Sequence, residues 1–484
     1  MLMRLSRNGF LRQYGPFTYV FDRLAAFDEM YRDAEPFFRG LSREPRDREE
    51  IVRATLAAFD AADEAEVRRD FDELYAPLVA AGVVLAGETP AALDAQESRF
   101  SYDAPDPKTA PDDAVLSTAD RARLPQNVLG DWFAAHPTLF RLQLDVTQAC
   151  TERCIHCYIP EYNPVFLPFP KIASLLDELR EMGGLEVTLS GGECMLHPDF
   201  GRIVRYAREK DLLVGVLSNL TLLDEEKTAL LREADATVQV SLYSMDEAVH
   251  DGITKRPGSW RATKEAIERL READVPCRVS CPTMKPNYRG YLDVLRWARS
   301  LGMNAQTDFI IMGKMDGDTS NLGCRLDLAE TRTLLEDVIL RSVPMNSEYF
   351  DPARKESMPS DEAWMAAPVC GAGLDSLCVD ATGEAYPCPA FGGFRLGSVH
   401  ERPLRWIWEE SPAMLRLRAV RGLDFPKCAH CEDRDFCSVC MCRNFNETGD
   451  PFRPAEHFCR IAALNRKIVE QRMRAAGSRG EGDA

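Results

Sequence analysis

The chain has 484 residues, of which 45% are apolar, and its formal net charge is −18 at pH 7. This length predicts two to four domains, and the acidic balance argues against nucleic-acid binding through a general basic surface. The N-terminus lacks the apolar core of an export signal, and no stretch approaches the 18 apolar residues of a membrane span. Sixteen cysteines in such a chain indicate metal ligands in a reducing cytoplasm rather than disulfides, so we expect a cytoplasmic location and no membrane partner.

Residues 1–90 are expected to form a small separate domain. Helical apolar spacing follows three short strand patterns, which predicts a winged helix-turn-helix. Carboxylates on the third helix would meet a phosphate backbone badly, so DNA binding is the weaker interpretation. The order of elements resembles the recognition element of ribosomally made, post-translationally modified peptide (RiPP) pathways, which implies capture of a precursor's leader segment as an added strand. The strands are predicted at 10–14, 17–21 and 27–31, and the helices at 35–41, 46–59 and 64–81.

Residues 91–138 are rich in Pro, Asp and Ala and read as a linker that ends in a helical piece. From 139 to 345, strands alternate with amphipathic helices, which predicts an α/β fold with a parallel sheet, either open or curved into a partial barrel. The six strands are expected at 140–147, 186–190, 212–218, 237–243, 277–283 and 305–312.

The first cysteine motif spans Cys150 to Tyr158 and places thiols at Cys150, Cys154 and Cys157, directly after the first of these strands. Three thiolates can hold three irons of a [4Fe–4S] cube, whereas a structural zinc site needs four closed ligands. His156 is badly placed as a fourth ligand. With His before the third Cys and Tyr after it, the motif resembles that of radical S-adenosylmethionine (SAM) enzymes. The resemblance implies a partial (β/α)6 barrel, SAM on the open iron, and reductive cleavage to a 5′-deoxyadenosyl radical.

A second motif, Leu189-Ser-Gly-Gly-Glu193, follows the second strand of the barrel. Its plain interpretation is a strand-to-helix turn, and ordinary capping explains any single polar residue at a strand end equally well. One βα unit after the cysteine loop, however, it resembles the Gly-Gly-Glu motif of radical SAM enzymes, in which the carboxylate meets the SAM amino group. The resemblance implies SAM contacts from Ser190, Gly191, Gly192 and Glu193, ribose contacts from Ser218 and Asn219, His156 near the adenine, Ser241 near the methionyl end and Arg256 near the carboxylate.

Nine further cysteines lie between 370 and 459, more than packing requires. Paired zinc knuckles are one interpretation. The spacing resembles the SPASM extension of radical SAM enzymes, which implies two auxiliary [4Fe–4S] clusters in residues 346–474 and three clusters in all. In that family a further cysteine stands four residues after the one that matches Cys437. In this chain that position is Met441, so Cys440 or Cys442 must replace the missing cysteine, and we favour Cys442. Residues 475–484 are expected to be disordered. The implied ligands are Cys370, Cys378, Cys388 and Cys442 for one cluster, and Cys428, Cys431, Cys437 and Cys459 for the other.

These resemblances together imply an enzyme that oxidatively crosslinks a ribosomal precursor peptide. A thioether is the first expectation, and a carbon–carbon or carbon–oxygen bond is the next. The implied partners are the precursor, whose leader binds the N-terminal domain, and an electron donor such as flavodoxin or ferredoxin. Formylglycine formation, as in anaerobic sulfatase maturases, is disfavoured because Pro389 stands where those enzymes have a catalytic Asp. A leader-binding redox-sensing adaptor remains open, although the two intact motifs disfavour it.

Overall fold

The computed structural model describes residues 1–59, 63–104, 125–342 and 360–480. Contacts divide the chain into two compact units. The first comprises residues 1–114, 119–132 and 183–185, and the second comprises residues 115–118, 133–182 and 186–484. No described helix is both long and apolar enough to cross a membrane.

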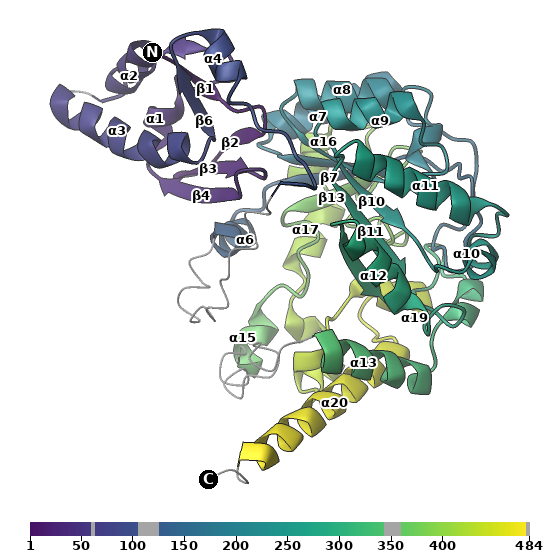
Figure 1. The fold of residues 1–484 in the computed structure, drawn as a ribbon. Coiled ribbons are helices and arrows are strands. Elements are labelled where there is room, and N and C mark those ends of the chain that lie inside the picture. The colour runs from purple at the N-terminus through teal and green to yellow at the C-terminus, as the bar shows by residue number, and fades with distance from the viewer. Residues whose placement is uncertain (60–62, 105–124, 343–359, 481–484) are drawn as a thin grey trace. The chain divides into compact units, whose positions relative to one another are not determined.

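The first unit holds two small antiparallel sheets (Figure 1). One sheet has the order β2-β3-β4, with β2 at Gly9–Tyr14, β3 at Phe17–Asp22 and β4 at Phe27–Arg32. Gly15, at φ 56°, turns the chain between β2 and β3 in a conformation that favours glycine. The second sheet, β5-β1-β6, was not predicted, and its strands are β1 (Leu2–Leu5), β5 (Arg46–Asp47) and β6 (Val84–Gly87).

Helices α1 (Glu35–Phe38), α2 (Arg48–Leu56) and α3 (Glu64–Ala80) close the core of this unit. The Asp47 and Asp63 side chains cap α2 and α3 by accepting backbone hydrogen bonds from Glu49 and Ala65. The apolar side chains whose spacing predicted α2 and α3 face the core of the unit. They are all buried, namely Ile51, Val52, Val67, Phe71, Tyr75 and Leu78.

The unit continues past residue 90, where the sequence suggested that a linker begins. Helix α4 (Pro90–Asp94) packs on β6 and β1, and the Arg4 guanidinium pairs with Asp94 at 2.8 Å and Glu97 at 2.5 Å. Helix α6 (Pro125–Ala135) corresponds to the helical piece that was predicted at the end of the linker. The central part of the predicted linker, residues 105–124, lies outside the described residues.

The second unit is built on a nine-stranded sheet with the order β12-β11-β10-β9-β8-β7-β13-β14-β15. The first six strands named here are parallel neighbours, which confirms the α/β fold with six βα units (Figure 1). The strands are β7 (Arg141–Thr147), β8 (Glu186–Gly191), β9 (Leu213–Leu217), β10 (Thr237–Ser241), β11 (Cys277–Pro282) and β12 (Asn304–Asp308). The intervening helices are α7 (Phe169–Glu181), α8 (Phe200–Glu209), α9 (Glu225–Glu233), α10 (Glu247–Thr254), α11 (Ser259–Glu272), α12 (Tyr291–Ser300) and α13 (Leu328–Ser342).

The C-terminal hairpin extends this sheet, which the sequence did not indicate. Strand β13 (Ser376–Val379) pairs in parallel with β7, and β14 (Glu384–Tyr386) and β15 (Gly397–Ser398) follow in antiparallel order. The turn after β13 therefore lies beside the end of β7 that leads into the cysteine loop. The predicted boundary at 345/346 lies outside the described residues.

Short helices complete the C-terminal region, and the long helix α20 (Glu456–Gly480) packs on α13. Disorder was expected from residue 475, but α20 continues to Gly480, and only residues 481–484 lie outside the described part of the chain. The other helices are α15 (Asp361–Ala366), α16 (Leu404–Glu409), α17 (Pro412–Ala419), α18 (Pro426–Ala429) and α19 (Met441–Thr448).

Candidate functional site

The cysteine loop begins where β7 ends. Thr147 fixes its start, because the Thr147 hydroxyl donates to Val165 O at 2.8 Å and accepts from Ala149 N at 3.0 Å. Each of the three thiols is half-buried, and each lies within electrostatic reach of the others. Burial raises the pKa of Cys150 to about 12 and that of Cys154 well above its ordinary value. Binding a metal at these thiols must therefore release protons.

The Gly-Gly-Glu loop lies directly against the cysteine loop. Gly192 N donates to Thr147 O at 2.8 Å, and Glu193 N donates to Ala149 O at 2.8 Å. A Cβ atom on Gly191 or Gly192 would come within 2.2 Å of a carbonyl oxygen of the cysteine loop. Gly191 also has φ 122°, a conformation that other residues rarely adopt. The two motifs that sequence analysis singled out are thus joined by backbone hydrogen bonds that only glycine permits.

Glu193 is 1% exposed, and its carboxylate joins its own loop after β8 to the end of β9. Its Oε1 accepts from Ser218 Oγ at 2.8 Å and from Met195 N at 3.0 Å, and its Oε2 accepts from Asn219 N at 2.9 Å. Burial raises the pKa of Glu193, while these hydrogen bonds oppose the rise. The Ser218 hydroxyl donates to the Glu193 carboxylate, and the ribose contacts expected from Ser218 and Asn219 stay predictions.

A polar network continues from Asn219 to Arg256. The Asn219 side chain donates to Thr151 Oγ1 at 2.9 Å and accepts from Thr221 N at 3.0 Å. The Arg256 guanidinium donates to Thr221 Oγ1 at 2.9 Å and favours the charged form of Glu152. Arg256 is therefore held beside the cysteine loop, where a SAM carboxylate was expected to meet it.

His156 packs edge-on against Tyr243, with ring centroids 5.2 Å apart. Burial lowers the pKa of His156 to about 4, so its imidazole is neutral at pH 7. Tyr243 OH lies 3.5 Å from His156 Nε2 and 3.9 Å from Cys154 Sγ. Ser241, at the end of β10, hydrogen-bonds the Tyr243 side chain. Ser190 lies on the other side of the loop, where it hydrogen-bonds Asp145.

Sequence reasoning missed Glu152 and the Thr151–Thr221 pair. Glu152 is 4% exposed, its pKa is raised to about 7 chiefly by burial, and its Oε2 accepts from Cys154 Sγ at 3.3 Å. The two threonine hydroxyls lie 2.9 Å apart. No pattern marks these residues, because loop polarity alone does not reveal burial. Tyr243 is visible in the sequence only as the last residue of the strand expected at 237–243.

The C-terminal cysteines fall into two groups. Cys428, Cys431, Cys437 and Cys459 interact with one another, as the sequence suggested for one cluster. In the other group, Cys442 hydrogen-bonds both Cys388 and Cys440, and Cys370 feels the charges of Cys388 and Cys440. The Cys442 hydrogen bond lowers the pKa of Cys440 to about 5. Cys440, expected to be spare, thus lies within this group.

Cys378 occupies a different position. It is 1% exposed, and its Sγ lies 3.8 Å from Asp145 Oδ2, although it also feels the charge of Cys388. Among the described residues, no group of three His, Cys, Asp or Glu side chains lies close enough to bind one metal ion. In a [4Fe–4S] cube each cysteine binds a different iron, so its ligands stand farther apart than those of one ion.

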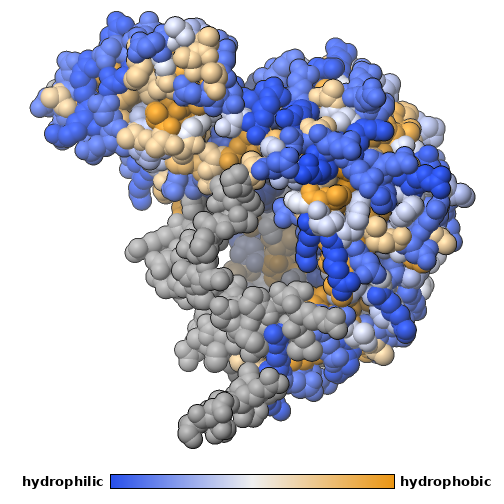
Figure 2. Space-filling view, in the orientation of Figure 1, coloured by the Kyte–Doolittle hydropathy of each residue, from blue (hydrophilic) through white to orange (hydrophobic). Residues whose placement is uncertain are grey.

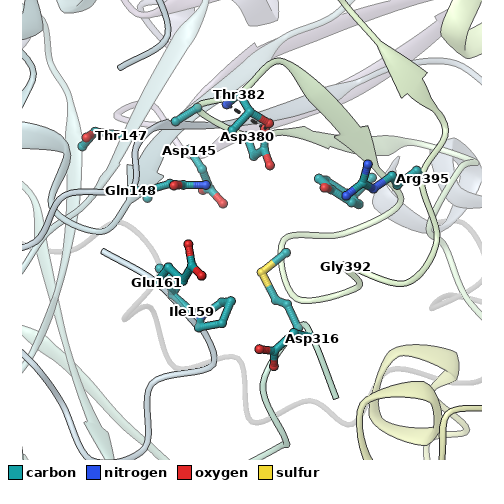
Figure 3. Close-up of a pocket in the computed structure, with 15 residues that line it drawn as sticks. Asp145, Thr147, Gln148, Ile159, Glu161, Asp316, Asp380, Thr382, Gly392 and Arg395 are labelled. Carbon is teal, nitrogen blue, oxygen red and sulfur yellow. Dashed lines mark hydrogen bonds between the residues drawn. The ribbon is translucent and has the colours of Figure 1, made fainter. Parts of the chain in front are cut away.

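A cavity of about 290 Å³ lies between the barrel and the C-terminal hairpin (Figure 3). Gly191 and Thr147 line it at the ends of β8 and β7, Asp380 and Thr382 line it from the hairpin turn, and Met315 lines it from the loop after β12. Burial, with a further contribution from the negative charge of Asp380, raises the pKa of Asp145 in its wall to about 6.

Profile comparison matches residues 144–286 to the radical SAM superfamily and residues 370–432 to SPASM, an iron–sulfur cluster-binding domain. The matched ranges contain the cysteine loop, the Gly-Gly-Glu loop and most of the cysteines between 370 and 459. The chain therefore contains a radical SAM domain and a SPASM domain. Both matches confirm the domains and the fold class expected from the motifs.

This chain is similar to enzymes of more than one kind, among them a heme synthase and a peptide cyclase. It is 28% identical over 335 residues to the AdoMet-dependent heme synthase of Methanosarcina barkeri, covering 65% of this chain and 94% of that one. It is 24% identical over 344 residues to the PqqA peptide cyclase of Bradyrhizobium diazoefficiens, covering 69% and 89%. The structure of Streptococcus suis SuiB bound to its precursor peptide SuiA shares the fold, with a TM-score of 0.61, 16% identity and coverage of 93% and 98%.

The residues at the barrel mouth fit the groups that a radical SAM domain implies. The donor set is three gathered thiols, and the glycine loop packs directly against the loop that carries them. Two buried polar atoms, His156 Nδ1 and Glu152 Oε1, have no partner among the described residues. Each would be satisfied by a polar ligand at this place.

Proposed function

We propose that this protein is a radical SAM peptide maturase that oxidatively crosslinks a ribosomally made precursor peptide, with a thioether as the first candidate bond. The observation that carries the proposal is an open sheet edge in the N-terminal unit of a chain that also has a radical SAM domain. A peptide-binding element and a radical-forming site in one chain are what such a reaction requires.

The N-terminal unit offers a place for a leader peptide. Among the described strands, β4 pairs only with β3, so its other edge can accept an added strand. Two partly buried apolar side chains of β4 itself, Phe27 and Tyr31, pack against the core of this unit. Figure 2 shows an apolar area on this face of the unit. Holding the leader here would raise the local concentration of the core segment at the catalytic site.

We assign Cys150, Cys154 and Cys157 to the SAM-binding cluster. When bound, the cluster and SAM supply a carbon-centred oxidant that removes a hydrogen atom from an unactivated C–H bond. Glu193 would receive the SAM ammonium through the free lone pairs of its oxygens, and Arg256 would receive the carboxylate. His156 and Tyr243 form the neutral aromatic wall beside the thiols. Ser190, Gly191, Gly192, Ser218, Asn219 and Ser241 complete the SAM site in this proposal.

The two C-terminal cysteine groups would hold auxiliary clusters, which supports an oxidative outcome because they can accept electrons from the substrate. An external donor such as flavodoxin or ferredoxin would reduce the first cluster. The catalytic site must also exclude water during turnover, because a reactive carbon-centred species needs a dry site.

Heme synthesis and formylglycine formation are weaker candidates. A tetrapyrrole carrying carboxylates suits neither the size nor the acidic lining of the cavity. For formylglycine formation, Pro389 cannot act as the base expected after Cys388. A redox-sensing adaptor would not consume SAM.

The proposal is tested by anaerobic co-expression with each short open reading frame beside the gene, followed by mass spectrometry. We expect one peptide to lose two hydrogens per crosslink. An unchanged mass for all of them, or oxidation at one site to an aldehyde, would contradict crosslinking. Repeating the experiment with Cys154→Ser separates enzymatic modification from spontaneous oxidation.

A further inference from the structure

The cavity beside the Gly-Gly-Glu loop is lined by segments distant in sequence. The ends of β7 and β8 contribute Asp145, Thr147 and Gly191, and the hairpin turn contributes Asp380. Because Gly191 belongs both to the cavity and to the proposed SAM loop, a side chain in the cavity lies next to the place where SAM would be cleaved.

The lining combines apolar walls with carboxylates. The walls come from Ile159, Pro160, Met315, Ala381 and Tyr386. Around them stand Asp145, Glu161, Asp316 and Asp380, with Arg395 as the one basic residue of the lining. Figure 3 shows the Asp145, Asp380 and Glu161 carboxylates turned toward the same space.

These carboxylates lack basic partners. Among the described residues, none of the four lining carboxylates forms an ion pair with a Lys or Arg side chain, and Arg395 pairs with none of them. Asp145 accepts from the neutral Gln143 side chain at 2.8 Å and contacts the Cys378 thiol at 3.8 Å. Asp380 Oδ1 accepts from the Thr382 and Glu384 N–H groups and from the Thr382 hydroxyl, and the Asp380 carboxylate also hydrogen-bonds the Tyr386 side chain, so its partners are neutral. Asp145 and Asp380 are half-buried, whereas Glu161 and Asp316 are exposed. Half-buried carboxylates without a basic partner lose part of their hydration, and a bound cation would offset that cost.

We propose that this cavity binds an aliphatic cationic side chain, Lys or Arg, of the peptide substrate. The inference rests on the proposed peptide-maturase function and specifies its substrate. The methylene stem of such a side chain matches the apolar walls, and its charged head reaches Asp145 and Asp380. An acidic side chain would be repelled, and a neutral one would leave both carboxylates unpaired.

Equilibrium dialysis against the anaerobically reconstituted holoenzyme with SAM tests this binding. The probes are the Nα-acetyl N-methylamides of lysine, arginine, norleucine and glutamate, together with Nε-acetylated lysine. We expect the lysine or arginine probe to bind about tenfold more tightly than norleucine or acetylated lysine, and the glutamate probe to bind least. Whichever cationic probe binds more tightly identifies the head group.

Asp380→Asn is the informative variant, because its Oδ1 retains the hydrogen bonds of the turn. It should weaken binding of the cationic probe about tenfold. Glu384→Gln removes one charge from the same hairpin outside the cavity and should leave binding unchanged. Equal binding of charged and neutral probes, or equal effects of the two variants, would overturn the inference. Formation of 5′-deoxyadenosine by the same preparation reports separately on the proposed function, since probe binding does not require turnover.

Discussion

Ser218 Oγ donates a hydrogen bond of 2.8 Å to Glu193 Oε1, which ties the end of β9 to the loop after β8. Glu193 N in turn donates to Ala149 O in the cysteine loop. The side chain and the backbone N–H of one buried residue, Glu193, thus join the ends of three consecutive strands of the barrel. In the proposed enzyme, the same carboxylate meets the ammonium of SAM, so positioning and binding depend on one residue.

Glu193→Gln should weaken SAM binding about tenfold or more. The change removes the negative charge, and the amide NH2 would also face the backbone N–H of Asn219 or of Met195. Equilibrium dialysis of SAM with reconstituted protein measures the effect. Glu186→Gln at the opposite end of β8 is the matched control, because it breaks only an exposed ion pair with Arg141. Equal affinities for the two variants would remove Glu193 from the SAM site.

Gly192→Ala should separate the two motif loops. Its new Cβ would lie 2.2 Å from Ala149 O, so the loops must move apart and the thiols with them. We expect a loss of iron from the first cluster and a lower melting temperature. Gly252→Ala in α10 is the control, since nothing lies within 4 Å of its new Cβ and Ala favours a helix by up to about 1 kcal/mol. Normal iron content and stability in Gly192→Ala would contradict the close junction.

Cys440→Ala should remove one auxiliary cluster, whereas Cys378→Ala should retain it. Cys440 lies with Cys370, Cys388 and Cys442, while the Cys378 thiol contacts Asp145. We therefore expect iron and sulfide to fall by about a third in Cys440→Ala, with the loss of one electron paramagnetic resonance signal. Cys277→Ala, a buried thiol on β11, controls for packing. Loss of iron in Cys378→Ala with normal iron in Cys440→Ala would restore the ligand set expected from the sequence.

His250 should make stability fall below neutral pH. It is 1% exposed, and burial lowers its pKa to about 4, with a small opposing contribution from Asp251. The unfolded chain binds this proton below about pH 6.5 and the folded chain only near pH 4, so stability is lost as pH falls through that window, by at most about 3 kcal/mol. Denaturant unfolding of His250→Asn, which retains an acceptor for Tyr243 N, should show a weaker pH dependence between pH 7 and 5 than the parent. The same slope in both proteins would contradict this account.

Several parts of the fold could be predicted because each is local in sequence. The β7–β12 strands, the helices between them and the loops bearing Cys150 and Glu193 follow from periodicity and motif spacing. Strands β1, β5 and β6 were missed because they are short and pair across more than 40 residues. The pairing of β13 with β7 joins segments more than 200 residues apart, so no local pattern revealed it.

The limits of sequence reasoning at the site have the same cause. The motif indicated Glu193 as a SAM contact, but its bonds to Ser218 and Asn219 depend on the neighbouring strand end. The approach of Asp380 to Asp145, which shapes the cavity, depends on the β13–β7 pairing. Disorder was expected from residue 475, whereas helix α20, whose earlier turns pack on α13, continues to Gly480.

The most direct test measures 5′-deoxyadenosine from SAM in anaerobically reconstituted, dithionite-reduced protein. Cys150→Ser, Cys154→Ser and Cys157→Ser are compared with the parent, and Cys281→Ser, a buried cysteine on β11, serves as the control. We expect the parent and the control to form 5′-deoxyadenosine and the three loop variants to form none above background. Formation at the parent's rate by the loop variants, or none by the parent, would contradict the account.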